Sequence, residues 1–424
     1  MFTSIHPTER RALVLACLCN GALFASFYIL RPVRDTLATL IGTVRLQDLF
    51  AGTFVGTLIA SPIYAALASR IRLERLLPGV FVFWLLNALA FAGLLQHAPD
   101  NRWIAGTYFI WFSVVNLYMV SVFWSLMVDV FSASQATRLF PLIAGAGEIG
   151  AIAGPLLTHA LVGRLGLPGL LLLAAGGLLL VTMLVQWLVG AKRQFGADDE
   201  HAQQSTLDHG LSGHPFEGFG ELLASAYVRR QAWFVLLMSW VNTLAYFFQT
   251  DLIARSFPAM ANRAQAIADI DLVVNVLSAV ILLLGLGRLL QRFGVTAGLI
   301  LNPLIMIVAL IGLWLAPGVR VLQALQVARR VGQYAIARPS REICFTVVPQ
   351  RSRYKAKNVI DTVVYRFGDL SSAWLQSGLR LLGLGFGSAI ALGLGVSVAW
   401  ALVGALLGRS YERLRAREES HVGA

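Results

Sequence analysis

The chain has 424 residues, of which 57% are apolar and only 13% are charged, and its mean hydropathy is +0.70. A soluble domain carries about a quarter charged residues, so this composition excludes an ordinary soluble enzyme and intrinsic disorder. The formal net charge is +12. Because the basic residues lie in short stretches between long apolar runs, they indicate loops beside a membrane rather than a nucleic-acid-binding surface.

Long apolar runs dominate the sequence, and most approach the 20 or so residues that an α-helix needs to cross a bilayer. Their continuity excludes a lipid-facing barrel, whose strands would alternate in segments of about ten residues. The sequence therefore predicts an all-α integral membrane protein with twelve transmembrane helices. The predicted spans are 12–30, 47–68, 78–96, 104–128, 139–161, 169–190, 231–253, 270–287, 295–316, 320–347, 358–380 and 384–407.

The Lys and Arg residues predict how these spans are oriented. Twenty of them fall on the side that holds both termini, and nine fall on the opposite side. By the positive-inside rule, both termini are expected in the cytoplasm. The run after Arg11 is too long for a signal peptide and ends at Arg31-Pro32, so we do not expect it to be cleaved.

The end of the first span contains the string Tyr28-Ile-Leu-Arg31-Pro32-Val-Arg34-Asp35. Proline constrains the backbone, so the helix is expected to bend or stop there. Arg34 and Asp35 suit two positions equally well on composition alone. They either line the mouth of a cavity or lie at the interface with the arginine snorkelling to water.

The fourth span carries polar and aromatic side chains on or near one helical stripe. Such a stripe can stack on a planar ring, but it is more often the core of a helix bundle. Its members are Trp111, Asn116, Tyr118, Trp124, Ser125 and Asp129.

Glu148 follows in the fifth span, inside the GxGxxG string of Gly145 to Gly150. No strand precedes this string, so a dinucleotide site is rejected. Together with Gly154, the glycines predict close packing between helices. The carboxylate itself predicts a proton site or a partner for an arginine.

The two halves of the chain repeat at an offset of about 220 residues, as Asn20 and Asn242 illustrate. A parallel duplication of this kind predicts two six-helix bundles of the major-facilitator plan, with a substrate site between them. His201, His209 and His214 in the long polar loop match no metal-ligand spacing. The expected domains are 1–190 (first bundle), 191–230 (cytoplasmic linker with a short amphipathic helix over 216–227), 231–408 (second bundle) and 409–424 (basic cytoplasmic tail).

Spans ten and eleven hold an unusual concentration of charge. Arg330, Tyr334 and Arg338 follow i, i+4, i+8 spacing, which predicts a common helix face, and Arg341 and Glu342 come directly after them. The Arg338-Pro339 step is expected to break the helix. Since arginine is always charged and binds carboxylate or phosphate, we favour an anion site over a purely structural network with the acids of span eleven. That span carries Asn358, Asp361, Tyr365, Arg366 and Asp369.

Three stretches resemble the nucleotide transporter family, the ATP:ADP antiporters of plastids and obligate intracellular bacteria. They are Tyr28 to Leu37, Phe123 to Leu142 and Ala356 to Val364. The resemblance implies a major-facilitator-like antiporter. It also implies that Arg34 stands where the family usually has a key lysine, that Asp129 is the family acid after Phe123-Trp124, and that Arg341-Glu342 corresponds to a Lys-Glu pair.

Two positions depart from the family pattern. Ala245 stands where the seventh span usually carries a glutamate, and Gly368-Asp369-Leu-Ser371 replaces Gly-Lys-Ser-Gly. Exchanging a basic residue for an acid weakens the attraction for a polyphosphate, so a less charged substrate becomes plausible.

The sequence thus predicts a secondary transporter of an organic anion, nucleotide-like, that works by alternating access. The alternative is a proton-coupled transporter of another small molecule. We expect a monomer with no enzymatic activity, cofactor or nucleic-acid partner. We also expect no disulfide and no metal site, since Cys17, Cys19 and Cys344 form no CxxC motif. The candidate substrate-binding residues are Arg34, Arg338, Arg341, Arg366, Tyr334 and Trp124, and those for gating or proton coupling are Asp35, Asp129, Glu148, Glu342, Asp361 and Asp369.

Overall fold

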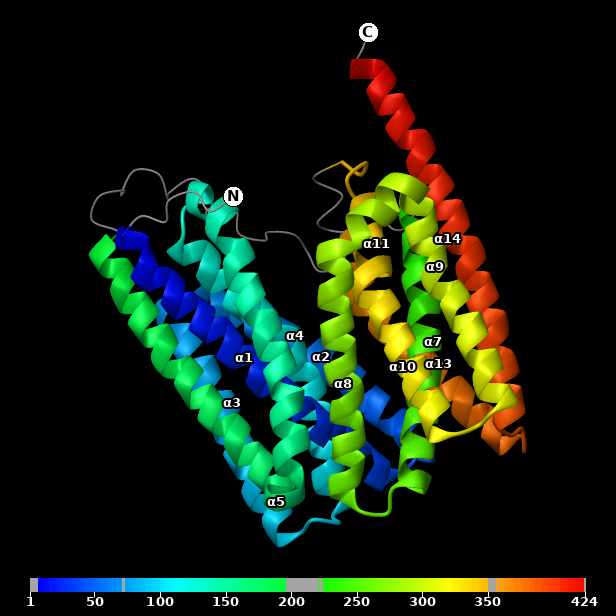
Figure 1. Ribbon diagram of the computed structural model, residues 1–424, viewed down its shortest axis with the longest axis horizontal. Coiled ribbons are helices and arrows are strands. Elements are labelled where there is room, and N and C mark those ends of the chain that lie inside the picture. Colours follow the sequence, from blue (N-terminus) through cyan, green and yellow to red (C-terminus); the bar gives the residue numbers. More distant parts are fainter. Residues whose placement is uncertain are drawn as a thin grey trace. The chain divides into compact units, whose positions relative to one another are not determined.

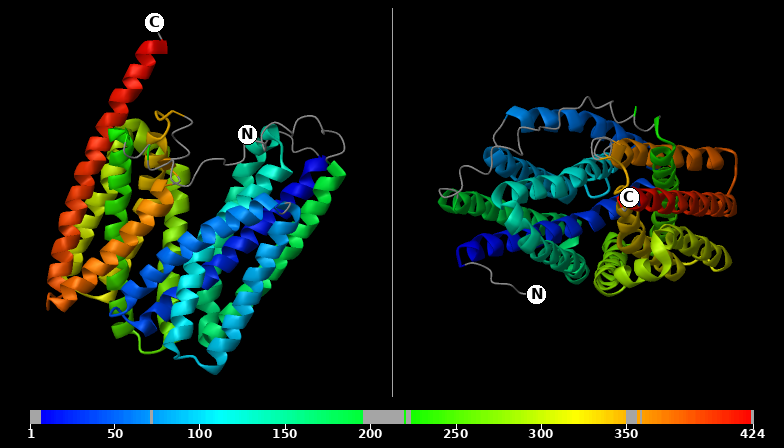
Figure 2. Two further views of the ribbon diagram at one scale, coloured as in Figure 1. Left: turned by 180° about the vertical axis from the view of Figure 1, so that it is seen from behind. Right: turned by 90° about the horizontal axis from the view of Figure 1, so that it is seen from above.

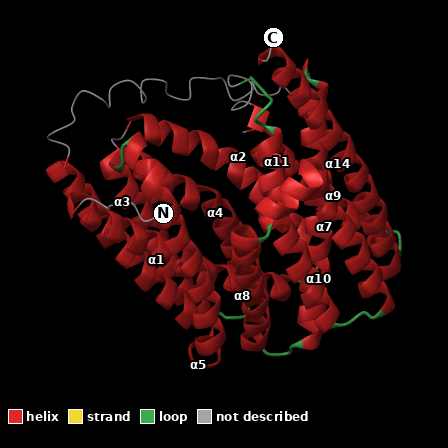
Figure 3. Ribbon diagram, turned by 45° about the horizontal axis from the view of Figure 1, so that its top comes forward, coloured by secondary structure: helices red, strands yellow, loops and turns green. Residues whose placement is uncertain are grey.

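The computed structural model describes residues 7–70, 73–195, 220, 224–349, 356–357 and 359–422. Within these ranges the secondary structure is entirely helical, as Figure 3 shows. Nine of the described helices are long and apolar enough to cross a membrane, judged by length and composition. In a bilayer every backbone amide must be bonded within the segment, which is why continuous apolar runs become helices.

The first half of the chain forms five long helices (Figure 1). The last of them holds two predicted spans, 139–161 and 169–190, because Gly166 (φ 65°, ψ −174°) breaks the helix between them. Only glycine adopts this backbone conformation without strain. The helices are α1 (Pro7–Ile41), α2 (Leu46–Arg70), α3 (Leu73–His97), α4 (Arg102–Val130) and α5 (Ala133–Phe195).

The second half follows the same plan, but two of its spans contain a π-helix. Residues 319–344 and 360–381 are each part π-helix and part α-helix. The elements are α7 (Ala226–Ser256), α8 (Met260–Leu284), α9 (Leu286–Leu315), α10 (Val319–Val331), η1 (Gly332–Ala337), α11 (Arg338–Cys344), η2 (Ile360–Val364), α13 (Tyr365–Leu381) and α14 (Phe386–Val422). Each predicted span therefore coincides with helix over most of its length.

The described helices group into two compact units that do not follow the middle of the sequence. Unit 1 comprises Met1–Gly42, Val55–Gly210 and Phe257–Leu272, and unit 2 comprises Thr43–Phe54, Leu211–Ser256 and Val273–Ala424. The first part of α2 belongs to unit 2, where Phe50 contacts the rings of Tyr246 and Phe247. The first part of α8 belongs to unit 1. The sequence-based domain boundaries of 1–190 and 231–408 stay a prediction.

Unit 1 is organised around the contact between α1 and α5. A Cβ atom at Gly150 would lie 2.0 Å from the carbonyl oxygen of Gly21, so only glycine allows this approach. Gly154 likewise lies against Ala25 and Tyr28. The predicted small-residue packing is confirmed, and the GxGxxG string lies within a helix rather than at a strand-to-helix turn.

In unit 2, α14 (red in Figures 1 and 2) packs along α9 and α7. α14 continues as helix through the predicted tail to Val422. The linker that was expected over 191–230 lies largely outside the described residues, and so do its three histidines. Of the amphipathic helix expected over 216–227, only 220 and 224–227 are described, and α7 begins at Ala226.

Two expectations about helix ends are wrong, and the expectation that the first helix bends or stops at Pro32 is wrong as to the stop. α1 passes through Pro32 without stopping and ends at Ile41, since neighbouring helices make a proline tolerable in a membrane helix. Pro339 does not end its helix either, because it occupies the first turn of α11, where its missing N–H is not needed. α8 begins ten residues before the predicted start at 270. The prediction began too late because Arg263 and Asp269 interrupt the apolar pattern on which it was based.

Candidate functional site

Two groups of charged side chains lie within the predicted spans, one in each unit. The unit 2 group comes from α11, η2 and α13 together with the polar side of α7. The unit 1 group comes from α1, α4, α5 and the first part of α8. Each group is described within its own unit.

One ion pair of unit 2 joins α11 to η2. Arg341 places Nη1 2.6 Å from Oδ1 of Asp361 and Nη2 3.4 Å from Oε1 of Glu342. Lys357 also binds Glu342 through its ammonium group. The Arg341 side chain is buried, whereas those of Asp361 and Glu342 are about a third exposed. Three of the predicted site residues, Arg341, Glu342 and Asp361, are therefore in direct contact. Lys357 also belongs to this group, although the sequence analysis did not name it as a site residue.

Arg338 differs from its neighbours in this group. Its side chain is exposed, and it forms no hydrogen bond or ion pair with any residue that the structure describes. It lies three residues before Arg341 in the same helix, so the two arginines are neighbours on one side of α11. Counting Arg338, Arg341 and Lys357 against Glu342 and Asp361 gives three positive and two negative charges, an excess of one positive charge.

The predicted common face of Arg330, Tyr334 and Arg338 is wrong. Arg330 is only 2% exposed, Tyr334 is half-buried and Arg338 is exposed. The reason is η1, which lies between the first and the last of them. A π-helix bonds i to i+5 instead of i to i+4, so it changes the direction in which the following residues point.

Two arginines of α10 have neutral partners. Arg329 donates to Oδ1 of Asn242 at 2.6 Å and to Gln326, and Arg330 donates to Gln249 at 3.1 Å. The side-chain amides supply hydrogen-bond acceptors to these buried guanidinium groups. A structural role therefore accounts for the two arginines without a bound anion. The sequence analysis included Arg330 in a candidate anion site and did not anticipate the amides of α7.

Asp369 lies in a polar pocket between α13 and α7. Its Oδ1 accepts hydrogen bonds from Ser239 at 2.6 Å and from Thr243 at 3.0 Å, and its Oδ2 lies 3.5 Å from Nη1 of Arg366. Arg366 and Asp369 are three residues apart on α13, so this pairing joins neighbours on one helix face. The hydroxyls on α7 were not anticipated, although Ser239 and Thr243 recur at the i, i+4 spacing of one helix face.

In unit 1, Arg34 and Asp35 pair with each other, at 2.6 Å between Nη2 and Oδ1. The guanidinium of Arg34 also lies over the rings of Phe109 and Phe112, with its carbon 5.3 and 5.6 Å from the ring centres. The Asp35 side chain has no exposed surface. Both residues are therefore packed inside the helix bundle of unit 1, and the interfacial alternative does not fit this geometry.

The remaining predicted site residues of unit 1 are spread over two helices. Trp124 contacts the rings of Phe123 and Phe140, and Asp129 is half-buried near the end of α4. The six stripe residues on α4 are half-buried, whereas Tyr108, three residues before Trp111, is fully buried and donates to the carbonyl of Leu30. Glu148 is exposed on α5 and forms no ion pair with a described residue.

Unit 1 also holds two contacts that the sequence analysis missed, both made by the first part of α8. Nη1 of Arg31 lies 3.7 Å from Oδ1 of Asp271. Nδ1 of His159, on α5, lies 2.5 Å from Oδ1 of Asp269. His159 is the one histidine of its predicted span, and the sequence signal for these contacts was the pair of acids at 269 and 271 in an otherwise apolar segment.

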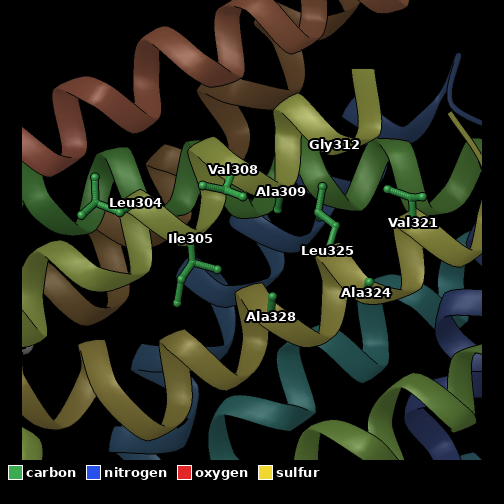
Figure 4. Close-up of a pocket in the computed structure, with 9 residues that line it drawn as sticks. All are labelled: Leu304, Ile305, Val308, Ala309, Gly312, Val321, Ala324, Leu325 and Ala328. Carbon is green, nitrogen blue, oxygen red and sulfur yellow. The ribbon is translucent and has the colours of Figure 1, made fainter. Parts of the chain in front are cut away.

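One groove of about 420 Å³ lies between α9 and α10 (Figure 4). Its lining is apolar, with no charged side chain, so it does not suit an anion. It is lined by Leu304, Ile305, Val308, Ala309, Gly312, Val321, Ala324, Leu325 and Ala328.

No family model matches the sequence, and no curated protein matches it. Solved structures do match over nearly the whole chain. A bacterial homologue of the iron transporter ferroportin in an inward-facing state aligns with a TM-score of 0.63 at 15% identity, covering 96% of this chain and 99% of that one. A bacterial homologue of the human lysosomal transporter Spinster, inward-facing and unoccupied, aligns with a TM-score of 0.59 at 16% identity, covering 97% and 98%.

The nucleoside transporter NupG aligns with a TM-score of 0.56 at 13% identity, covering 96% of this chain and 99% of its own. The chain has the fold of major-facilitator transporters. At these identities the likeness shows a common fold and does not identify the substrate of this chain. The roles assigned above to single residues remain predictions.

Proposed function

We propose that this protein is a secondary transporter that moves an organic anion, nucleotide-like in chemistry, across a bacterial inner membrane by alternating access. Its fold and its apolar helices support transport, because proteins of similar fold include several named as transporters. The nucleotide-like substrate is supported by the resemblance of the three sequence stretches to the ATP:ADP antiporters. The charge asymmetry of the loops supports a cytoplasmic location for both termini.

The observation that supports an anionic substrate is the excess positive charge at α11. Arg338 is exposed beside the Arg341–Asp361 pair and has no ion-pair partner among the described residues. A planar guanidinium binds a phosphate or carboxylate with two parallel hydrogen bonds. An anion held by Arg338 then competes with Asp361 for Arg341, so substrate binding exchanges one ion pair for another.

Arg34 and Arg366 take part differently, since each already has a carboxylate partner in Asp35 and Asp369. In the proposed cycle these pairs open when the anion arrives and close when it leaves, with the acids restoring neutrality. Because Arg34 and Arg366 are paired, neither of these two leaves a bare positive charge in the membrane when the protein is empty. Asp369, where the nucleotide transporter family usually has a lysine, favours a nucleotide of lower charge than ATP.

The test is uptake by proteoliposomes that contain the purified protein, with labelled nucleotides outside and unlabelled nucleotide as counter-substrate inside. We expect exchange of at least one nucleotide and its loss, by tenfold or more, in Arg338→Gln. Arg320→Gln is the matched control, since Arg320 is an exposed arginine at the start of α10. Failure of every nucleotide to exchange removes the nucleotide clause, and equal activity in the two variants removes Arg338 from the site.

Glu148 favours the second candidate function, a proton-coupled transporter of a non-nucleotide small molecule. It is an ionisable group in a predicted span, exposed on α5 and without an ion pair in the described structure. Such groups in membrane helices mark proton or substrate pathways. This function requires uptake that a pH gradient drives without counter-substrate and that Glu148→Gln abolishes. Uptake that needs internal counter-substrate and survives Glu148→Gln excludes it.

A further inference from the structure

The pair formed by His159 and Asp269 is the feature of unit 1 that the proposed transport scheme does not use. Nδ1 of His159 lies 2.5 Å from Oδ1 of Asp269, and Nε2 lies 3.2 Å from the amide nitrogen of Gln265. Gln265 and Asp269 are four residues apart, so both project from one face of α8. Both nitrogens of the imidazole ring are thus engaged by the same helix.

We propose that His159 and Asp269 form a proton-binding site that holds the first part of α8 against α5. The role of this site in transport rests on the proposed function, whereas the site itself is defined by side chains within unit 1. Histidine is the side chain whose ordinary pKa lets it change charge between pH 5 and 8. Protonated, it forms a charge-assisted bond with the carboxylate, and such bonds are about twice as strong as neutral ones.

The neighbouring groups allow the proton to be taken up without rearranging the helices. In the neutral ring, Nδ1–H donates to Asp269 and Nε2 accepts from the Gln265 amide. When a proton is added at Nε2, the ring needs an acceptor there, and the Gln265 side chain supplies its oxygen by rotating its amide. An amide serves as donor or acceptor, so the same residue satisfies both protonation states.

The other charged groups around this pair are engaged elsewhere. On α1, Arg31 lies 3.7 Å from Asp271 and Arg34 is bound to Asp35. On α8, Arg263 donates to Thr39 and to the carbonyl of Phe257. Arg164 on α5 is exposed and lies more than a turn beyond His159. His159 is therefore the ionisable partner within 4 Å of Asp269 in the described part of the chain.

Protons have a short path to the pair. The side chains of His159 and Asp269 are 46% and 43% exposed in the protein alone. At 1.5 Å of rise per residue, His159 lies about 10 Å from the break at Gly166, and Asp269 lies about 14 Å from the start of α8. By the predicted orientation both ends face away from the cytoplasm, so the pair responds to the pH outside.

The site acts on a helix, α8, whose two parts belong to different units. Its first part, up to Leu272, belongs to unit 1 with α1 and α5, whereas the rest belongs to unit 2. The His159–Asp269 and Arg31–Asp271 contacts are two ion pairs that link α8 to other helices of unit 1. Loss of the proton weakens the first of these contacts and favours separation of α8 from α5.

The experiment measures the distance between α5 and α8 directly and needs no substrate. Spin labels are placed at Arg164→Cys and Asn262→Cys, both exposed, in a chain whose native cysteines are replaced, and the protein is held in lipid nanodiscs. Pulsed dipolar spectroscopy then gives the distance distribution between pH 5.5 and 8.5. We expect the ratio of near to far populations to fall about tenfold as the pH rises.

His159→Gln abolishes this response, Asp269→Asn reduces it, and His97→Gln, which changes an exposed histidine at the end of α3, leaves it unchanged. The proposal is overturned if the parent distribution does not change with pH or if the full response persists in His159→Gln. Asp269→Asn decides the matter should His159→Gln not fold, since an unchanged response there also overturns it. Absence of nucleotide uptake would remove the proposed substrate and leave this result intact.

Discussion

The contact of α1 with α5 in unit 1 and that of α7 with α13 in unit 2 occupy equivalent places in the duplicated sequence. Gly147-Glu148 and Gly368-Asp369 are 221 residues apart. In both, the glycine lets a neighbouring helix approach: a Cβ at 147 would lie 2.5 Å from the Asn20 amide, and one at 368 would lie 2.8 Å from Cβ of Ser239.

The acids that follow these glycines have opposite environments. Glu148 is exposed and unpaired in the described structure, whereas Asp369 is 7% exposed and bonded to Ser239, Thr243 and Arg366. The close approach of the backbones is thus common to both contacts, whereas the chemistry beside it differs. The first contact depends on packing, and the second depends on a polar network.

The largest effect is expected at the packing contact. Gly150→Leu places side-chain atoms where the carbonyl of Gly21 lies, so α1 and α5 must separate, and we expect a loss of 3 kcal/mol or more in stability, about the cost of severe overpacking. Gly145→Ala is the control, because a Cβ there meets nothing within 4 Å. Thermal unfolding in detergent measures both. Equal unfolding temperatures would show that the two helices do not need the glycine.

The polar contact is expected to come next. Asp369→Ala removes the acceptor of two buried hydroxyls and leaves Arg366 without its carboxylate, which costs about 3 kcal/mol for a buried pair and less where water reaches the guanidinium. Asp369→Asn keeps an oxygen for the hydroxyls and should lose about half as much. Thermal unfolding of the two variants side by side gives the comparison. A larger loss in the Asn variant would contradict the hydroxyl contribution.

A smaller effect is expected for Arg341 and Asp361. Asp361 is 33% exposed, so solvent screens the pair, and a double-mutant cycle with Arg341→Gln and Asp361→Asn should give a coupling of about 1 kcal/mol. The coupling is obtained from denaturant unfolding of the parent, the single variants and the double variant. A value near zero would mean that Glu342 alone satisfies Arg341.

The smallest effect on stability belongs to Glu148→Gln. No described hydrogen bond or ion pair is lost, so its unfolding free energy should stay within about 0.5 kcal/mol of the parent. Thermal unfolding under the conditions used for Asp369→Asn tests this. A loss as large as that of the Asp369 variant would erase the contrast between the two acids.

The sequence was a good guide to the helices because hydropathy and length decide them. It failed where polar residues extend a helix beyond its apolar core, as at Arg263 and Asp269 at the start of α8, and where proline is tolerated, as at Pro32. Periodicity reports an ideal helix, so it missed η1 and with it the different environments of Arg330 and Arg338.

For the candidate site, local spacing was informative and distant pairing was not. The pairs Arg34–Asp35, Arg341–Glu342 and Arg366–Asp369 are neighbours along the chain and were accessible from sequence. His159 with Asp269 joins residues 110 apart, and nothing in a single sequence specifies which helices meet. The neutral amides that bind Arg329 and Arg330 carry no pattern at all.

The π-helix η1 has a consequence for how this stretch can vary in length. A π turn holds one residue more than an α turn, so deleting one residue from Gly332–Ala337 allows the backbone to re-form as regular α-helix. Because a π turn and an α turn each make one revolution, the residues after the deletion would keep about their present directions. The same deletion within α10 would instead rotate Arg338 and Arg341 together by about 100° around the helix axis.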